Sequence, residues 1–265
     1  KAHAVRASES PELPAGPAVP AFEYSRTLAS EEVEERVKIR GLRRAIYETM
    51  ARSSRTVAHF TYVEEIDCTN LVEARSRLKA AADARGVRLS YLPFIAKAVL
   101  LALRQFPKMN ATMDDAAGEL VLKRYFHLGV AAATPAGLVV PVIEHADHRT
   151  LLELAGAIGD LGARARQNTL TPKELKGSTF TITSLGKIGG VLATPIVNHP
   201  EVAILGVHKM APRAVVRDGQ IVARPMMNLA LSFDHRVIDG HEGAEFTQRI
   251  RHYLEDPELM MLEMA

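Results

Sequence analysis

The order of helical and extended patterns along residues 38–265 constrains the fold more than any other feature. Apolar residues at helical spacing predict helices at about 40–54, 69–84, 93–106, 151–166 and 240–254. Shorter apolar runs predict strands at 60–66, 120–122, 126–133, 138–143, 180–183, 202–207, 214–216, 221–223 and 227–233. Because the two kinds of element are mixed without strict alternation, we expect an α/β fold, a two-layer sandwich with a mixed β-sheet.

Residues 1–37 differ in composition from everything that follows. Four prolines between positions 11 and 20 lie among alanines, and an acidic run follows at 31–35. Such a segment has few large apolar side chains that could offset the entropy of ordering. We therefore expect an Ala/Pro-rich and acidic linker over 1–37 and one domain over 38–265. A disordered tail is the alternative for 1–37, and the missing initial methionine predicts a piece of a longer chain.

Charge and cysteine content exclude several classes of protein. The 33 Lys and Arg against 31 Asp and Glu give a net charge of +2, which argues against a general nucleic-acid or membrane-surface binder. The most apolar stretch, 92–103, is interrupted by Lys97 and is shorter than the about 18 apolar residues of a membrane span. The single cysteine, Cys68, excludes an intrachain disulfide and a multi-cysteine zinc site, and fits a reducing compartment.

The densest concentration of reactive side chains is SFDHRVIDG, at 232–240. His235 stands at the end of a predicted strand and Asp239 follows four positions later. A neutral imidazole, with a pKa of about 6.5, can accept a proton near neutral pH. The spacing alone is more often that of a structural histidine paired with an aspartate at a loop.

A second cluster is FTITSLGKIGG, at 180–190. Its predicted strand ends at Thr183 and Ser184, whose hydroxyls could donate to a developing oxyanion. The glycines that follow match neither the Walker nor the dinucleotide fingerprint. A plain hairpin loop is the alternative.

Other candidate residues have less support. A metal site or a solvated polar turn could be formed by Glu144, His145, Asp147 and His148. His59 and His127 are expected in the core or at an edge, and His208 could line a cleft. Cys68 begins a predicted helix, where a thiolate gains stabilisation, but no base lies near it in the sequence.

Taken together, these motifs resemble the dihydrolipoamide acyltransferases, the core components of the 2-oxo acid dehydrogenase complexes. SFDHRVIDG looks like the His-x-x-x-Asp-Gly active-site motif of that catalytic domain. The other matching segments, from about residue 38 to the C-terminus, are KIRGLRRAI, LSYLPF, FTITSLGKIGG, ATPIVNHPEVAILGV and YLEDPELMMLE. HFTYVEEID and MNLALSFDHRVIDG look most like the bacterial branched-chain members, whereas the preceding PMM also resembles succinyl-transferring ones.

The resemblance implies a chloramphenicol acetyltransferase-like fold and roles for individual residues. His235 matches the general base, Asp239 its partner carboxylate, and Thr183 the oxyanion hydroxyl, where many members have serine. Positions that line the coenzyme A channel in branched-chain members are matched by Arg75, Ser90, Ser184 and Ser232. Ala133 stands where some relatives have an acidic residue in that channel, so local contacts with coenzyme A are expected to differ.

The implied activity is transfer of a branched-chain acyl group from S-acyl-dihydrolipoamide to coenzyme A, which is a substrate, with no metal. The lipoyl group would be carried on a separate upstream domain. The implied assembly is a homotrimer that forms a cubic 24-mer in preference to a 60-mer. The decarboxylase and dihydrolipoamide dehydrogenase components would bind through upstream domains, in the bacterial cytoplasm or, for a eukaryotic protein, the mitochondrial matrix.

Three alternatives stay open at this point. One is an acetyl- or succinyl-transferring member of the same family. Another is a free acetyltransferase of the chloramphenicol type, which the linker disfavours. The last is a non-catalytic core scaffold, which the intact pair of His235 and Asp239 disfavours.

Two further expectations concern contacts that the sequence does not show directly. An arginine of the first helix, Arg40, Arg43 or Arg44, is expected to pair with Asp239. The C-terminal residues Leu259, Met260, Met261, Leu262 and Met264 form an apolar cluster. Because exposing such side chains forgoes the free energy of burial, we expect the cluster to dock into a neighbouring trimer, with packing on its own subunit as the alternative.

Overall fold

The computed structural model describes residues 34–264, apart from the side chain of Lys187. Most of the predicted linker over 1–37 lies outside the described residues, and its conformation stays a prediction. Within the described part of the chain, no helix has the length and apolar character needed to cross a membrane.

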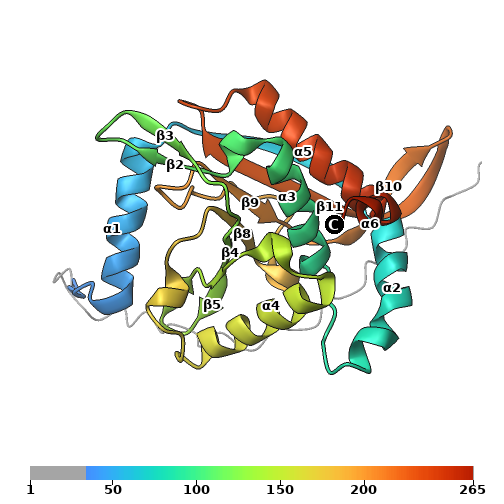
Figure 1. Cartoon of the computed structure of the whole chain (residues 1–265), viewed down its shortest axis with the longest axis horizontal. Coiled ribbons are helices and arrows are strands. Elements are labelled where there is room, and N and C mark those ends of the chain that lie inside the picture. The colour runs from blue at the N-terminus through green and yellow to red at the C-terminus, as the bar shows by residue number, and fades with distance from the viewer. Residues whose placement is uncertain (1–33, 265) are drawn as a thin grey trace, which may run out of the picture. The chain divides into compact units, whose positions relative to one another are not determined.

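A seven-stranded mixed sheet forms the centre of the domain (Figure 1). Its strands, in spatial order, are β1 (His59–Asp67), β11 (Gln220–Asp234), β9 (Ala203–Val207), β8 (Phe180–Ser184), β4 (Leu128–Val130) and β7 (Val142–Ile143), with β10 (Ala211–Arg217) also paired to β11. The β4–β8 and β8–β9 pairs are parallel and the others are antiparallel. Separate hairpins are formed by β2 (Ala111–Asp114) with β3 (Glu119–Leu122) and by β5 (Ala132–Thr134) with β6 (Gly137–Val139).

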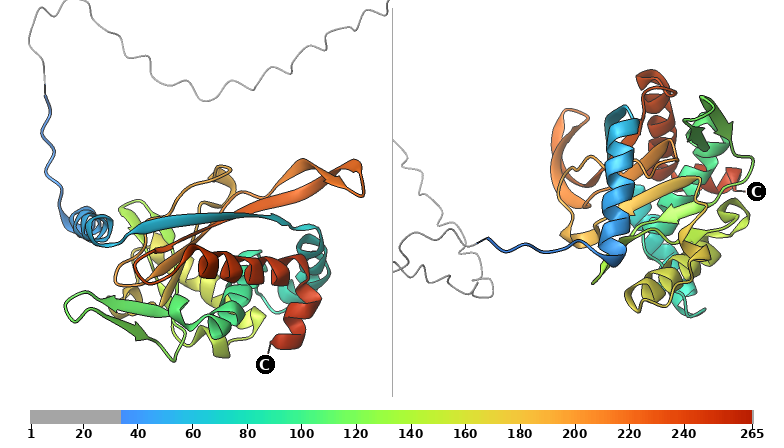
Figure 2. Two further views of the ribbon diagram at one scale, coloured as in Figure 1. Left: turned by 90° about the horizontal axis from the view of Figure 1, so that it is seen from above. Right: turned by 90° about the vertical axis from the view of Figure 1, so that its left-hand side faces the viewer.

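The α-helices are α1 (Gly41–Thr56), α2 (Thr69–Asp83), α3 (Leu92–Gln105), α4 (Leu151–Arg166), α5 (Gly240–Glu255) and α6 (Pro257–Glu263). Short 3-10 turns occupy Pro107–Met109, Ala146–His148, Lys173–Leu175 and Gly186–Ile188. Helices α3, α4 and α5 lie on one face of the sheet (Figure 1), and α5 runs beside β1 (Figure 2). The mixed sheet with helices on one face confirms the predicted two-layer α/β fold.

Aromatic packing fixes α5 on the sheet. The ring of Phe246 lies 5.8 Å from that of Phe180 on β8 and 5.7 Å from that of Phe106. A Cβ atom at Gly243 would lie 2.4 Å from the ring of Phe233, so only glycine lets the helix approach β11 this closely. The strand and the helix on either side of His235 are therefore held together by the core.

Most predicted elements are present, and the differences have local causes. The predicted strand over 126–133 is divided into β4 and β5, and that over 138–143 into β6 and β7, because these residues leave the main sheet to form a hairpin. The runs at 221–223 and 227–233 belong to the one strand β11, which pairs with β10 along its first half. Strand β2 and helix α6 were not predicted.

Candidate active site

His235 lies in the short connection between the end of β11 and the start of α5. Its backbone N–H donates a 2.9 Å hydrogen bond to the carbonyl of Ala58, just before β1. Its exposed ring packs edge-on against Phe60, with the ring centroids 5.0 Å apart. The backbone of His235 is thus anchored while its imidazole stays accessible, so that it could accept a proton from a bound molecule.

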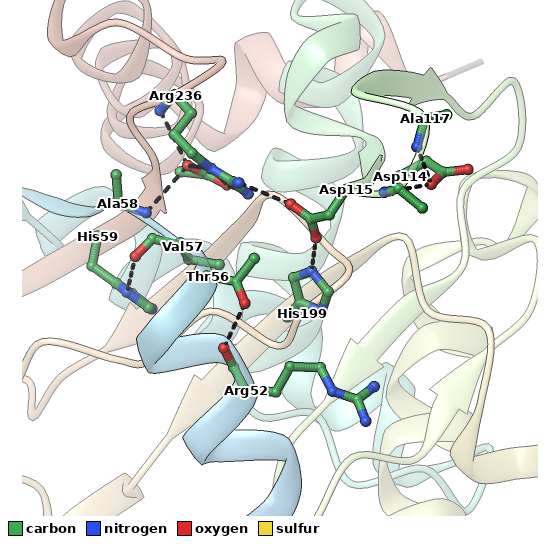
Figure 3. Close-up of polar contacts among 12 residues, drawn as sticks. Arg52, Thr56, Val57, Ala58, His59, Asp114, Asp115, Ala117, His199 and Arg236 are labelled. Carbon is green, nitrogen blue, oxygen red and sulfur yellow. Dashed lines mark hydrogen bonds and ion pairs between the residues drawn. The ribbon is translucent and has the colours of Figure 1, made fainter.

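The two residues on either side of His235, Asp234 and Arg236, form an ion pair with each other. Asp234, whose side chain is 1% exposed, accepts hydrogen bonds of 2.6–2.9 Å from the guanidinium of Arg236. The remaining Nη1 of Arg236 donates to Asp115 at 2.8 Å, and the other oxygen of Asp115 lies 2.6 Å from Nε2 of His199 (Figure 3). These bonds raise the pKa of Arg236 and lower that of Asp115. The sequence analysis singled out neither Asp115 nor His199.

Asp239 is the N-cap residue of α5 and is exposed. Its carbonyl accepts from the N–H of Gly243 at 3.0 Å. No hydrogen bond among the described residues joins its carboxylate to His235. No ion pair in residues 34–264 joins it to Arg40, Arg43 or Arg44, so the predicted arginine pairing is not formed within one chain.

Thr183 lies at the other end of the sheet. It is the second-last residue of β8, is half-buried, and is paired with Gly206 of β9. Gly206 in turn is paired with Ala230 of β11. Ser184 ends the strand, and its Oγ accepts from the N–H of Gly186 at 3.2 Å.

The strand register separates Thr183 from His235. Both β8 and β9 run antiparallel to β11, and Thr183 is level with Ala230, five residues before His235. With about 3.3 Å per residue along a strand and about 4.8 Å between strands, the two residues lie roughly 19 Å apart. One chain therefore does not bring the two predicted catalytic residues together.

The predicted coenzyme A residues lie in three separate places. Arg75 donates to the carbonyl of Leu89 at 2.9 Å and lies over the ring of Tyr91, which places it beside the exposed Ser90. Ser232 is fully buried and shares a 2.8 Å hydrogen bond with the hydroxyl of Thr61. Ser184 is two strands away from Ser232.

Two other histidines use their ring nitrogens in hydrogen bonds with backbone groups. His59 has Nδ1 3.1 Å from the carbonyl of Val57, and its Nε2 accepts from the N–H of Val197 at 3.1 Å. Nε2 of His208 accepts from the N–H of Ala193 at 3.4 Å, and burial lowers the pKa of this imidazole. Their acceptor nitrogens hold the backbone between β8 and β9.

The remaining candidates offer little reactivity. Nδ1 of His127 accepts from the N–H of His145 at 3.1 Å. Among residues 34–264, no group of three or more histidine, cysteine or acidic side chains is arranged to hold a metal ion. Burial, with Asp67 and Glu255 nearby, raises the pKa of the Cys68 thiol to about 12, so this thiol stays protonated at neutral pH.

One buried carboxyl group was missed by the sequence analysis. Glu201 accepts from Ser178 at 2.5 Å, Thr181 at 2.7 Å and Asn198 at 2.8 Å. Burial raises its pKa to about 7, although the three hydrogen bonds act in the opposite direction. Its position within an apolar run, HPEVAILGV, was the available signal.

A comparison with protein families identifies the domain. The family described as "2-oxoacid dehydrogenases acyltransferase (catalytic domain)" matches residues 31–262. The chain belongs to this family. This confirms the resemblance that the motifs carried.

Curated relatives in this family are components of pyruvate dehydrogenase complexes. The dihydrolipoyllysine-residue acetyltransferase component from Bacillus subtilis (strain 168) is 45% identical over 230 residues, which are 87% of this chain and 52% of the relative. That from Staphylococcus aureus (strain COL) is 42% identical over 255 residues, 96% of this chain and 58% of the relative. The chain thus spans about half the length of these relatives. The predicted branched-chain type is not supported by them.

Solved structures give the same fold. The dihydrolipoamide acetyltransferase of Azotobacter vinelandii, studied for the catalytic roles of a serine, a histidine and an asparagine, matches with a TM-score of 0.82 at 39% identity, over 92% of this chain and 99% of that one. A structure described as the cubic core of the pyruvate dehydrogenase multienzyme complex gives the same values. A truncated catalytic core from Thermoplasma acidophilum matches with a TM-score of 0.78 at 40% identity, over 84% of this chain and 99% of that one.

Proposed function

We propose that this domain transfers an acetyl group from S-acetyl-dihydrolipoamide to coenzyme A, with His235 as the general base. The spacing of three residues carries the proposal. Thr183 precedes His235 by 52 positions and Asp239 follows it by 4, the same spacing as the serine, histidine and asparagine studied in the Azotobacter vinelandii enzyme. Threonine keeps the hydroxyl of serine, whereas Asp239 introduces a negative charge in place of an amide.

The chemistry of the two substrates defines what His235 must do. A thiol with a pKa of about 8.5 is a weaker acid than imidazolium at about 6.5, so full proton transfer from coenzyme A is uphill by roughly 2.7 kcal/mol. His235 therefore removes the proton as the sulfur attacks the thioester carbonyl. The tetrahedral oxyanion accepts a hydrogen bond from Thr183. When the intermediate collapses, the carbon–sulfur bond to dihydrolipoamide breaks and the leaving thiolate takes the proton from His235.

We further propose that each active site is shared by two copies of the chain. A base and an oxyanion donor roughly 19 Å apart cannot act on one carbonyl group. A neighbouring copy that brings its Thr183 to this His235 would complete the site, as the trimer implied by the family resemblance would do. The cubic core described for a similar structure supports a larger assembly of such trimers.

The wider assignments are proposed from the same family membership. The pair formed by Arg75 and Ser90 would contact coenzyme A, together with Ser184. Ser232, whose hydroxyl is buried against Thr61 in one chain, would reach coenzyme A only if this contact opened. The matched residues make up only 52% and 58% of these curated relatives, which are therefore longer than this chain. We propose that a lipoyl group on another part of the protein delivers the acyl group, and that decarboxylase and dihydrolipoamide dehydrogenase components complete the complex.

The acyl preference is tested by comparing transfer of acetyl, isobutyryl and succinyl groups from dihydrolipoamide to coenzyme A. We expect the highest kcat/KM with acetyl, because the curated relatives reported above are acetyltransferases. A clear preference for isobutyryl would restore the branched-chain assignment that HFTYVEEID favours. No transfer of any of the three would overturn the proposed reaction.

A further inference from the structure

A continuous chain of hydrogen-bonded polar side chains links the connection that carries His235 to two distant segments. It runs from Asp234 through Arg236 and Asp115 to His199, with successive contacts of 2.6, 2.8 and 2.6 Å (Figure 3). Asp115 lies in the turn between β2 and β3, and His199 lies before β9. Three parts of the molecule that are remote in sequence thus meet beside the proposed base.

The inner end of this chain is fixed by backbone hydrogen bonds as well. The N–H of Ala58 lies 3.4 Å from Oδ1 of Asp234, and its carbonyl accepts from the N–H of His235 at 2.9 Å. The N–H of Arg236 also donates to Oδ1 of Asp234, at 3.1 Å. The backbone before and after His235 is therefore defined by the orientation of one buried carboxylate, and that carboxylate is held by Arg236.

The outer end of this chain, formed by Asp115 and His199, sets the direction of the Arg236 side chain. Its Nε and Nη2 are occupied by Asp234, and Nη1 by Asp115. His199 in turn contacts the second oxygen of Asp115, so the carboxylate plane of Asp115 is set from both sides. The hairpin that carries Asp115 is itself attached to the same segment, because the N–H of Met113 donates to the carbonyl of Pro200 at 2.8 Å.

We propose that Asp115 and His199 are positioning residues for His235. They hold Arg236, and through it Asp234, in the one orientation that directs the imidazole toward the thiol of coenzyme A. This proposal rests on the proposed function of His235. Neither residue touches substrate, so both affect turnover through the position of the base and leave the binding of coenzyme A intact.

The test compares Asp115→Asn with the matched control Asp114→Asn in the assembled protein. Asp114 lies in the same hairpin, but within residues 34–264 its carboxylate accepts only from the N–H groups of Ala116 and Ala117. We expect Asp115→Asn to lower kcat about tenfold to a hundredfold, since small displacements of reacting groups have such effects, with KM for coenzyme A unchanged. Asp115→Glu, which restores the charge, should recover part of kcat, and Asp114→Asn should match the wild type.

A second variant covers the case in which Asp115→Asn fails to fold. His199→Gln removes the outer contact and should lower kcat in the same direction. Combined with Asp115→Asn, it should add no further loss, because both act through Arg236. Wild-type kcat in Asp115→Asn and His199→Gln, or an equal loss in Asp114→Asn, would overturn the positioning role. His235→Ala, measured alongside, separates this result from failure of the proposed function, since wild-type transfer in His235→Ala would contradict the latter.

Discussion

The two ends of the central sheet differ in how completely one chain supplies their hydrogen bonds and buries their apolar side chains. At the His235 end, Asp234 is buried and fully hydrogen-bonded, and the core packs Phe233 against α5. Beyond Thr183, the chain between β8 and β9 leaves large apolar side chains in the open, with Ile188 95% exposed. Such exposure favours burial by another protein surface. The proposed base is therefore held in place within one chain, whereas the proposed oxyanion donor lies next to a surface that one chain leaves uncovered.

The largest expected effect is at the end of the sheet that carries His235. Replacing His235 by alanine should lower kcat by about 10²- to 10⁴-fold, because proton removal from the thiol loses its general base. The matched control is His241→Ala, an exposed histidine on α5 whose nearest charged partner is Glu245. Steady-state transfer to coenzyme A measures both. Near-wild-type turnover in His235→Ala would remove this residue from its role.

The next largest effect is expected at the end of the sheet that carries Thr183. Thr183→Val keeps the shape of the side chain and deletes its hydroxyl, so kcat should fall by about 10²- to 10³-fold while KM for coenzyme A changes little. Thr183→Ser retains the donor and should be mild. A rise in KM alone in Thr183→Val would make Thr183 a binding residue.

Changes in the C-terminal helix test whether the larger assembly can be disrupted without loss of the active site. Pro257 and Met260 of α6 are buried within the chain, but Leu262 is 83% exposed. Thus the predicted cluster packs partly on its own subunit. Truncation after Pro257 should release active trimers from the larger assembly, and Leu262→Ser should do so without removing Met260. Sedimentation that shows the large assembly intact in both variants, or inactive monomers in both, would contradict a role in joining trimers.

The smallest expected effect concerns Glu201, which ties β8 to the segment before β9. Its native pKa of about 7 exceeds the unfolded value of about 4.3, so the native state holds an extra proton between these values. This contribution to stability is present at low pH and is lost as the pH rises through 7. Melting temperatures between pH 5 and pH 8 should fall less in Glu201→Gln than in the wild type.

The exposed Glu144→Gln serves as the control for that comparison, because its carboxylate lies at the surface near Lys173. Its melting curve should follow the wild type over the same pH range. Parallel pH dependence in the wild type and Glu201→Gln would show that Glu201 is ionised when buried.

How far the sequence predicts the structure depends on whether the deciding contacts are local. Helix α4 is predicted to the residue, since Thr150 and Glu153 form a capping box within four positions. Strand β11 is predicted as two pieces, because its continuity comes from pairing with β10 and β1. Strand β2 has only four residues, and its apolar and polar residues do not clearly alternate, so no local pattern predicts it.

The same distinction applies to the site. His235 and Asp239 stand four positions apart and are recognisable as a motif. The contacts between Arg236, Asp115 and His199 join residues from three distant segments, which no window of sequence can reveal. The distance between Thr183 and His235 likewise follows from strand register alone, and the sequence carries no sign of it.

The most direct test of the shared site is complementation between two impaired chains. Co-expression of His235→Ala with Thr183→Val should restore about a quarter of wild-type activity, because in random mixtures one interface in four combines an intact base with an intact hydroxyl. Each variant expressed alone should keep only the low turnover predicted for it above. If both residues acted within one chain, every site in the mixture would lack one of them, and activity no higher than that of the separate variants would contradict the shared site.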